Sequence, residues 1–262
     1  MSFEIHPYKL EVEGLGQKKG VLLEKDGRWG EVAPFPGRSR ETLDQAVEQL
    51  KAIKQGYAGK LLPSVAFGLF GLTAPRVFKA PVCLFLMGSP QEILRTAEDS
   101  QGCKTAKVKI GSFDVATAIS LVQTLLQKFR LRIDVGGKWS QEKLREFCSH
   151  FDANAFEFIE DPGFDISPFP MGADEGEWGS ITVWKPMIKG LPSKGSRLVL
   201  SSSFETAVGL HTIAALAEVF EIPMHPLGIG TFNKTQQDVL LEPLKIEQGE
   251  LIFPDEFRIR AI

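Results

Sequence analysis

Short apolar runs, each followed by a stretch of helical character, recur along the chain after Pro75. Continuous runs of branched and aromatic residues are typical of strands that are buried on both faces of a parallel sheet. Repeated strand and helix pairs within one long segment predict a (β/α) barrel. The expected strands are residues 82–87, 106–110, 131–135, 156–159, 181–184 and 198–200, and the clearest helices are residues 115–129, 141–151 and 206–220.

The part of this pattern between Glu160 and Ser202 is too short for regular barrel units. A barrel of about 250 residues in eight units averages about 31 residues per unit. Asp174 follows Glu160 by 14 positions and precedes Lys185 by 11, which leaves no room for full crossover helices. We therefore expect residues 175–180 to return the chain in an extended form, and residues 161–196 to lack at least two crossover helices.

The first 75 residues have a different sequence pattern. Short alternating segments, broken by glycines, predict an antiparallel meander, and the helix that follows can be capped by Ser39. We expect an α+β capping domain over residues 1–75 and the barrel over residues 76–235. The tail returns to short strand-like pieces, and we expect residues 236–262 to join the capping domain. The apolar positions of the predicted helix are Leu43, Val47, Leu50 and Ile53.

Composition restricts the partners of this chain. The formal net charge is -3 and no block of Lys or Arg is present, so the sequence offers no basic segment that would bind a nucleic acid or an anionic membrane. A small-molecule substrate is expected instead, and the sequence leaves the oligomeric state open. The cysteines Cys83, Cys103 and Cys148 are far apart and are read as reduced. Because neither a leader pattern nor a long apolar run is found, we expect a cytoplasmic protein.

Charged residues stand at the ends of the predicted strands. In a barrel, functional side chains gather at the C-terminal strand ends. Any one of these residues alone would be read as a solvated strand edge or a helix cap, but together and in this order they form a complete acid, base and metal set. The set is Lys107 and Lys109, then Asp134, Glu160, Asp174 and Lys185.

Side chains alternate between the two faces of a strand, and this alternation brings the two lysines of the set together. Lys107 and Lys109 are two positions apart, so both side chains point into the barrel mouth. Two neighbouring ammonium groups repel each other, and a proton is then easier to remove from one of them. Asp134, Glu160 and Asp174 offer the oxygen ligands that Mg²⁺ or Mn²⁺ prefers. The sequence therefore predicts a lysine base beside a divalent cation.

This ordered set resembles that of the enolase superfamily, and specifically its muconate-lactonizing-like subgroup. Residues 30–37 (GEVAPFPG) resemble the family's capping-domain loop, and residues 63–68 (PSVAFG) resemble its lead-in to the barrel. Residues 201–205 (SSSFE) resemble its serine motif on the seventh strand. The resemblance implies an α/β fold, with a modified (β/α)7β TIM-type barrel that has trimmed outer helices and a small capping domain.

The resemblance also implies a role for each matching residue. Lys109 would be the general base and then the acid, Lys107 its electrostatic neighbour, and Lys185 the cation on the opposite face of the substrate. The metal ligands would be Asp134, Glu160 and Asp174. Substrate contacts would come from Arg132, Ser201 and the backbone of Gly228, with residues 14–19 as a mobile lid. Gly136 stands where the family often has Asn, so support for Asp134 must come from elsewhere.

The implied activity is that of a lyase. It would catalyse magnesium-dependent syn dehydration of a succinyl-hydroxycyclohexadiene carboxylate, a step toward menaquinone. One alternative is an isomerase of the same subgroup, an N-succinylamino acid racemase or a dipeptide epimerase, although no Asp-x-Asp stands at the eighth strand to hold a dipeptide amine. Another alternative is a catalytically dead binding barrel.

Overall fold

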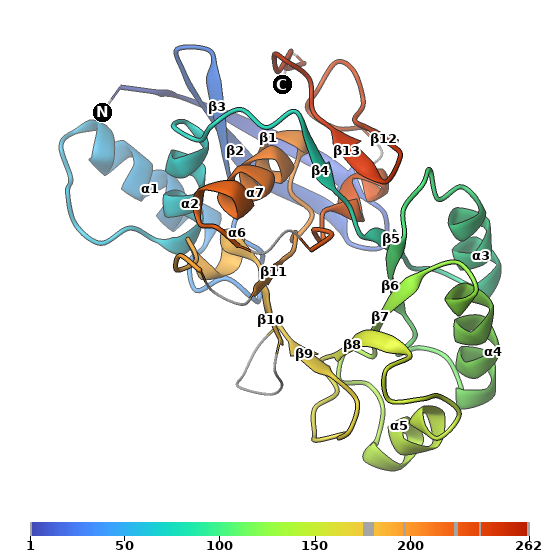
Figure 1. Cartoon of the computed structure of the whole chain (residues 1–262). Helices are drawn as coiled ribbons and strands as arrows, with labels where there is room; N and C mark the ends of the chain where they lie inside the picture. The colour runs from blue at the N-terminus through green and yellow to red at the C-terminus, as the bar shows by residue number, and fades with distance from the viewer. Residues whose placement is uncertain (1, 175–180, 196–197, 223–224, 236, 261–262) are drawn as a thin grey trace.

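The computed structural model describes residues 2–174, 181–195, 198–222, 225–235 and 237–260. Seven parallel strands lie side by side in chain order and curl into a ring (Figure 1). The ring is completed by parallel bridges from Leu227 to Val82 and from Gly228 to Ser201. The strands are β5 (Leu84–Leu86), β6 (Thr105–Lys109), β7 (Arg130–Asp134), β8 (Phe156–Glu160), β9 (Met171–Ala173), β10 (Ile181–Trp184) and β11 (Leu198–Leu200).

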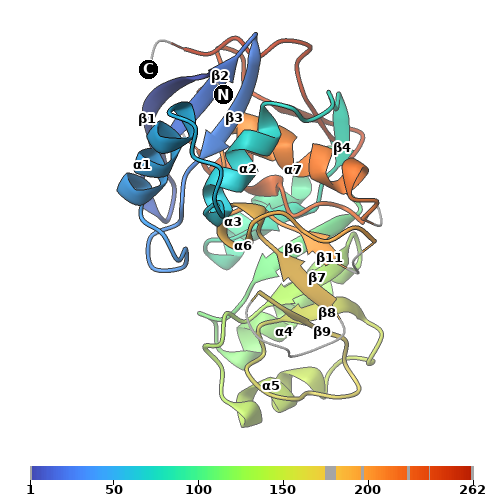
Figure 2. The ribbon, with the colours of Figure 1, turned by 90° about the vertical axis from the view of Figure 1, so that its left-hand side faces the viewer.

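Helices cover only part of the outer face of the ring. Figure 1 shows α3 (Pro90–Glu98), α4 (Val115–Leu126) and α5 (Gln141–Cys148) stacked along one side of the ring, while β9 and β10 carry no comparable cover among the described residues. Figure 2 shows α4 and α5 at the end of the molecule opposite to the two chain termini. Residues 161–170 contain no helix, and residues 185–195 contain only the four-residue α6 (Pro186–Lys189). The predicted trimming of the outer helices is confirmed, while the predicted extended return at residues 175–180 lies outside the described residues. Besides α6, the α-helices in the described part of the barrel segment are α3, α4, α5 and α7 (Ala207–Val219).

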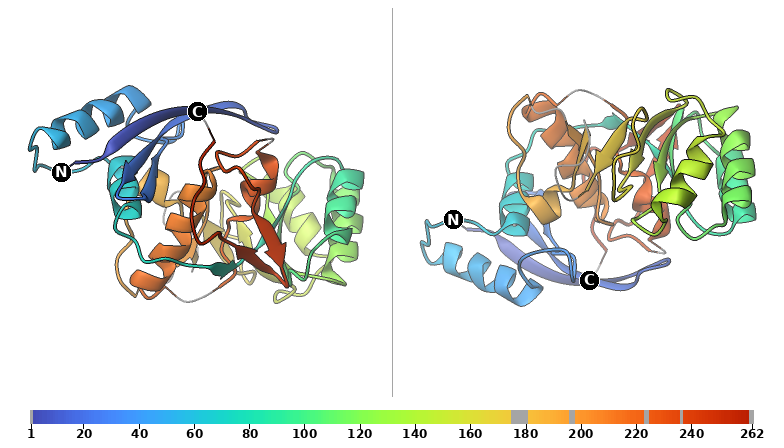
Figure 3. Two further views of the ribbon diagram at one scale, coloured as in Figure 1. Left: turned by 90° about the horizontal axis from the view of Figure 1, so that it is seen from above. Right: turned by 90° about the horizontal axis from the view of Figure 1, so that it is seen from below.

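Two smaller sheets accompany the barrel, and Figure 3 shows the first of them lying across one end of the molecule. The first sheet joins β1 (Glu4–Val12), β2 (Gly16–Lys25) and β3 (Arg28–Val32), all antiparallel. The second joins β12 (Lys245–Glu247) and β13 (Glu250–Ile252) of the tail to β4 (Lys79–Pro81), which leads into the barrel. The tail strands therefore pair with the start of the barrel segment. The remaining elements are α1 (Leu43–Lys54), α2 (Pro63–Gly71) and the 3-10 helix η1 (Gly230–Lys234).

Two local predictions need correction. The N-cap of α1 is Thr42, whose side chain accepts from the Gln45 backbone while the Gln45 side chain accepts from Thr42 in return. Ser39 is instead part of the preceding turn, where its Oγ accepts a 2.8 Å hydrogen bond from the Phe35 backbone. The strand β9 was missing from the predicted strands because it has three residues with glycine at its centre, too short for an apolar run.

A buried carboxylate joins the first sheet to the barrel. Glu31 of β3 is fully buried, and its Oε2 accepts hydrogen bonds from Thr206 N (2.9 Å), Thr206 Oγ1 (2.7 Å) and Gly209 N (3.1 Å). These donors lie at the N-terminus of α7, where Thr206 provides no side-chain cap of its own. Tyr8 of β1 donates to the other oxygen of Glu31. Glu31 thus caps a barrel helix from a different sheet.

Replacing Glu31 with alanine is expected to lower the free energy of unfolding by about 3 kcal/mol or more. The change would leave buried N–H and O–H groups of Thr206 and Gly209 without an acceptor, and each such group costs about 1 to 3 kcal/mol. Urea denaturation measures the effect, with Glu48→Ala on the exposed face of α1 as the matched control. Equal stability of the two variants would contradict this account of Glu31.

His211 makes the stability of the protein sensitive to mild acid. Its Nε2 accepts a 3.1 Å hydrogen bond from the Val77 backbone, and its ring packs edge-on against Phe253 and Phe257. Burial, with a smaller effect of Arg76, lowers the pKa of His211 from 6.5 to about 4. The folded state therefore keeps this ring neutral at a pH where the unfolded chain binds a proton.

The stability contributed by neutral His211 is fully present above pH 6.5 and is lost as the pH falls toward 4. Between pH 7 and pH 5 we expect the free energy of unfolding to fall by about 2 kcal/mol more in the unmodified protein than in His211→Gln, whose amide can still accept from Val77. Urea titrations at both pH values measure the difference. The same pH dependence in both proteins would exclude His211 as its source.

Candidate active site

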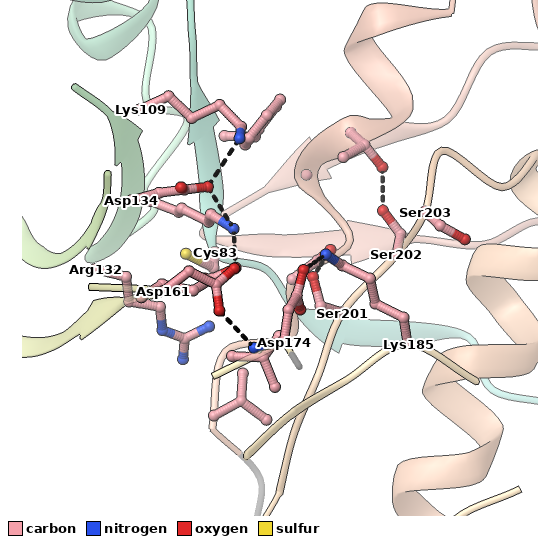
Figure 4. Close-up of a pocket in the computed structure, with 18 of the residues that line it drawn as sticks. Cys83, Lys109, Arg132, Asp134, Asp161, Asp174, Lys185, Ser201, Ser202 and Ser203 are labelled. Carbon is pink, nitrogen blue, oxygen red and sulfur yellow. Dashed lines mark hydrogen bonds and ion pairs between the residues drawn. The ribbon is translucent and has the colours of Figure 1, made fainter. Parts of the chain in front are cut away.

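The lysines and carboxylates predicted from the sequence meet at the C-terminal end of the barrel strands (Figure 4). Parallel pairing aligns Lys109 with Asp134 and Asp134 with Glu160, so three neighbouring strands present their last polar residue at one level. Lys107 lies one layer deeper, and its Nζ contacts Asp134 Oδ2 at 2.9 Å and Glu160 Oε1 at 2.5 Å. One ammonium group therefore joins two of the predicted metal ligands.

Lys107 and Lys109 converge on a single oxygen, as their alternation predicted. The Nζ of Lys109 also lies 2.9 Å from Asp134 Oδ2. The Lys109 side chain is 41% exposed and the Lys107 side chain 14%, so Lys109 is the lysine that an incoming molecule can reach. These contacts also supply the support for Asp134 that Gly136 cannot give.

A second group of charges surrounds Asp174. Its Oδ2 is paired with Lys185 and, at 3.3 Å, with Arg38 of the capping domain. Its Oδ1 is buried and has no hydrogen-bond partner among the described residues. Figure 4 places Lys185 on the opposite side of the acidic groups from Lys109. Positive side chains therefore flank the carboxylates on two sides.

Asp161 is a site residue that the sequence analysis missed. Its Oδ1 accepts a 2.9 Å hydrogen bond from the Asp174 backbone, which fixes the end of β9 against the end of β8. Carboxylate oxygens of Glu160, Asp161 and Asp174 lie within 4.8 Å of one another. The signal was present in the Glu160-Asp161 pair, but only one of two adjacent strand residues was expected to face the barrel mouth.

Burial and close charges shift the pKa values of these groups in opposite directions. Burial raises the pKa values of Glu160 and Asp161 above their ordinary range. Burial alone would raise the pKa of Asp134 too, but the charges of Lys107 and Lys109 outweigh it and hold that pKa low. Burial alone would lower the pKa of Lys107, but the negative charges of the surrounding carboxylates outweigh burial and raise that pKa, and Glu160 has the largest effect among them. These carboxylates therefore favour the charged form of Lys107.

The residues present fit a divalent cation. Hard cations such as Mg²⁺ take oxygen ligands about 2.0 to 2.1 Å away, so ligand oxygens must lie within a few ångströms of one another. The clustered carboxylates meet this requirement, and the unpartnered Oδ1 of Asp174 is a buried acceptor with nothing to accept from. Glu160 and Asp174 are common to this cluster and to the predicted ligands. The third predicted ligand, Asp134, is joined to Glu160 through Lys107.

Arg132 lines the pocket but is held by a neighbour. Its Nε and Nη2 donate to the two oxygens of Glu157 at 3.1 and 3.2 Å, and its guanidinium lies 5.3 Å from the Phe158 ring centre. The register of β7 and β8 shifts here, since Leu131 pairs with Phe156 but Arg132 pairs with Phe158. The extra residue in this irregularity is Glu157, which therefore meets Arg132.

Ser201 and Gly228 also line the pocket, and they are paired in the parallel bridge that helps to close the ring. The Gly228 N–H donates to the Leu200 carbonyl at 2.8 Å, and its carbonyl accepts from Ser202 N. Both backbone groups of Gly228 are thus engaged in closing the barrel. A Cβ at this position would collide with Ser201 Oγ, so glycine also keeps the serine in place.

The predicted lid segment is tied to the barrel at both ends. Just before it, Glu13 N donates to the Lys234 carbonyl at 2.8 Å, and Lys234 Nζ contacts the Glu13 carboxylate at 3.0 Å. Near its end, the buried Lys18 donates to the Phe204 carbonyl at 2.6 Å. Because Phe204 lines the pocket, Lys18 connects the capping sheet directly to the serine segment of the site.

Comparison with solved structures identifies the fold. The L-Ala-D/L-Glu epimerase from Bacillus subtilis superposes with a TM-score of 0.74 at 16% identity, covering 98% of this chain and 97% of the epimerase. An o-succinylbenzoate synthase from Thermosynechococcus elongatus BP-1, complexed with Mg in the active site, superposes with a TM-score of 0.66 at 22% identity, covering 92% and 96%. The chain has the capping-domain and barrel fold of the enolase superfamily, as predicted.

Sequence comparison points to a narrower group of proteins than the fold does. Residues 10–74 match the family described as MenC, N-terminal domain. The chain is also 29% identical to the o-succinylbenzoate synthase of Yersinia pseudotuberculosis serotype O:1b (strain IP 31758), in an alignment that covers 88% of each protein. The predicted resemblance is confirmed, and in sequence the chain is similar to o-succinylbenzoate synthases. Within the described part of the chain, no helix has both the length and the apolar character to cross a bilayer.

Proposed function

We propose that the protein is an o-succinylbenzoate synthase, a lyase that dehydrates 2-succinyl-6-hydroxy-2,4-cyclohexadiene-1-carboxylate to o-succinylbenzoate in menaquinone biosynthesis. The observation that carries the proposal is the meeting of Lys109 and Lys185 on opposite sides of one carboxylate cluster. The similarity to o-succinylbenzoate synthases over 88% of the chain supports the choice of substrate.

In this proposal Lys109 moves the protons. Its exposed amine would take the proton alpha to the ring carboxylate and then return a proton to the departing hydroxyl on the same face. Lys107 stays charged below it and, through Asp134, fixes where the amine of Lys109 lies. Lys185 would face the negative charge that develops on the substrate from the other side.

Asp134, Glu160 and Asp174 would hold Mg²⁺ or Mn²⁺, with Asp161 orienting Asp174 through its backbone. The cation, when bound, supplies Lewis-acid stabilisation of the negative charge on the substrate carboxylate. The protein itself would enclose the substrate in a largely apolar pocket. Apolar side chains of the capping loop and the barrel, including Phe35, Phe85 and Phe158, line the same pocket and limit the access of water to the reacting atoms.

An isomerase of the same superfamily is the second candidate. A racemase or epimerase needs a base on each face of the substrate, and Lys109 and Lys185 have the placement for that work. The candidates are an N-succinylamino acid racemase and a dipeptide epimerase, and the fold is also that of the Bacillus subtilis epimerase. The two reactions share the first proton abstraction and differ in whether hydroxide leaves.

The assay that separates these candidates uses one preparation and three substrates. The purified protein with Mg²⁺ is incubated with the cyclohexadiene carboxylate, with an N-succinylamino acid and with L-Ala-L-Glu in deuterium oxide. We expect the aromatic product from the first, followed by ultraviolet absorbance. Deuterium exchange and racemisation of the second or third substrate, without aromatisation of the first, would replace the lyase proposal with the isomerase. No reaction with any substrate would favour a dead barrel.

The domain limits and the cellular location follow as further proposals. We place the capping domain at residues 1–75 with residues 236–262, and the barrel at residues 76–235. The match of residues 10–74 to the MenC N-terminal domain supports the first limit. A pathway enzyme that acts on a small dicarboxylate is proposed to work in the cytoplasm.

A further inference from the structure

The capping loop that follows β3 carries an arginine into the pocket. Ser39 N and Arg38 N both donate to the Phe35 carbonyl, at 2.8 and 3.1 Å, and Ser39 Oγ accepts from Phe35 N. Gly37 has a φ of +78°, which an L side chain rarely adopts, so the turn suits glycine. This closed turn directs Arg38 toward Asp174, where Nη1 lies 3.3 Å from Oδ2. A capping-domain residue is thereby fixed beside the candidate metal ligands.

Among the cations that line the pocket in the described residues, Arg38 has the most uncommitted donors. Lys107 is held by Asp134 and Glu160, Lys185 by Asp174, and Arg132 by Glu157 through two hydrogen bonds. Lys109 is assigned to proton transfer. The guanidinium of Arg38 has five N–H groups, and Asp174 is its one partner in the described part of the chain. The Arg38 side chain is 49% exposed and lines the pocket, so an incoming ligand can reach those donors.

The proposed substrate has two carboxylates, and the site provides clear partners for one of them. The ring carboxylate would go to the metal end. The succinyl carboxylate was assigned from sequence to Ser201 and the Gly228 backbone, but the Gly228 N–H already donates to Leu200. Ser201 then offers a single hydroxyl, whose Oγ lies 3.4 Å from the Gly228 carbonyl. A guanidinium fork matches a carboxylate far better than one hydroxyl does.

We propose that Arg38 binds the substrate carboxylate that is not at the metal, and so selects for dicarboxylate substrates. This inference rests on the proposed function and deepens it. Arg38 lies on the capping domain, while the acid and base groups lie on the barrel. A contact between Arg38 and the substrate would therefore make recognition of the far end of the substrate depend on the capping domain as well as on the barrel. Loss of this contact raises KM with little change in kcat, because the succinyl group takes no part in bond making.

The test measures ligand binding and metal binding separately in four proteins. These are the unmodified protein, Arg38→Gln, Arg38→Lys and the control Arg40→Gln, which alters an exposed arginine of the same loop that does not line the pocket. Calorimetry with Mg²⁺ present gives the affinity for o-succinylbenzoate and for 2-propanoylbenzoate, which lacks the far carboxylate. Mn²⁺ affinity without organic ligand is measured by electron paramagnetic resonance.

Arg38→Gln is expected to weaken o-succinylbenzoate binding about 10- to 100-fold and to leave 2-propanoylbenzoate and Mn²⁺ binding unchanged. Arg38→Lys should recover part of the loss, and Arg40→Gln should match the unmodified protein. Equal losses for both ligands, or weaker Mn²⁺ binding, would mean that Arg38 acts only by orienting Asp174, and would overturn the inference. An unmodified protein that neither binds o-succinylbenzoate nor forms it would instead overturn the proposed function.

Discussion

Replacing Lys109 with arginine is expected to reduce dehydration by several orders of magnitude, although the positive charge remains. A guanidinium stays protonated at any working pH and cannot take a proton from carbon. Lys185→Arg is expected to retain measurable activity, limited by the bulk and planarity of the new group, because a cation that faces developing negative charge needs only its charge. Lys185→Ala should lose far more. Steady-state rates of aromatic product formation make the comparison.

Each of these variants needs a check on folding and on metal content. Lys109 contacts Asp134 and Lys185 contacts Asp174, so either change could act through a predicted metal ligand. Mn²⁺ affinity close to that of the unmodified protein excludes this route. A Lys109→Arg enzyme with full activity would show that Lys109 is not the base. A Lys185→Arg enzyme as inactive as Lys185→Ala would favour the two-base isomerase.

Removal of divalent cations is the second change with a large expected effect. Excess EDTA should abolish turnover, and Mg²⁺ or Mn²⁺ should restore it, because loss of the Lewis acid forfeits several kcal/mol of charge stabilisation in the transition state. Activity assays before and after metal is restored measure this, together with metal analysis of the protein. Full turnover in protein shown to be free of metal would remove the cation from the mechanism.

Two aspartates allow the ligand assignment itself to be tested. Asp134 and Asp161 both lie close to Glu160, but Asp134 is a predicted ligand while Asp161 is proposed to orient Asp174. Asp134→Asn should therefore weaken Mn²⁺ binding more than Asp161→Asn, for which a loss of about 10- to 100-fold is expected. The reverse order would assign Asp161 to the metal in place of Asp134.

The sequence by itself determined the barrel and the set of charged side chains at its strand ends. Side chains alternate along a strand with a period of two, so Lys107 and Lys109 had to face one way, and parallel strands bring their C-terminal ends to one edge. The short spacing after Glu160 likewise excluded full crossover helices, and residues 161–170 contain none. These conclusions depend on local geometry and chain length, which the sequence contains directly.

Contacts between distant segments were decided only by the tertiary structure. The partners of Glu31 at α7, Thr206 and Gly209, are 175 and 178 positions away in sequence, and Arg38 meets Asp174 across 136 positions. Because of the register shift between β7 and β8, the Arg132 guanidinium donates to Glu157. Because the barrel closes between Leu200 and Gly228, the Gly228 N–H donates to the Leu200 carbonyl. Periodicity says which way a side chain points within its own strand, but which donor and acceptor meet depends on how separate elements pack, and no local pattern records that.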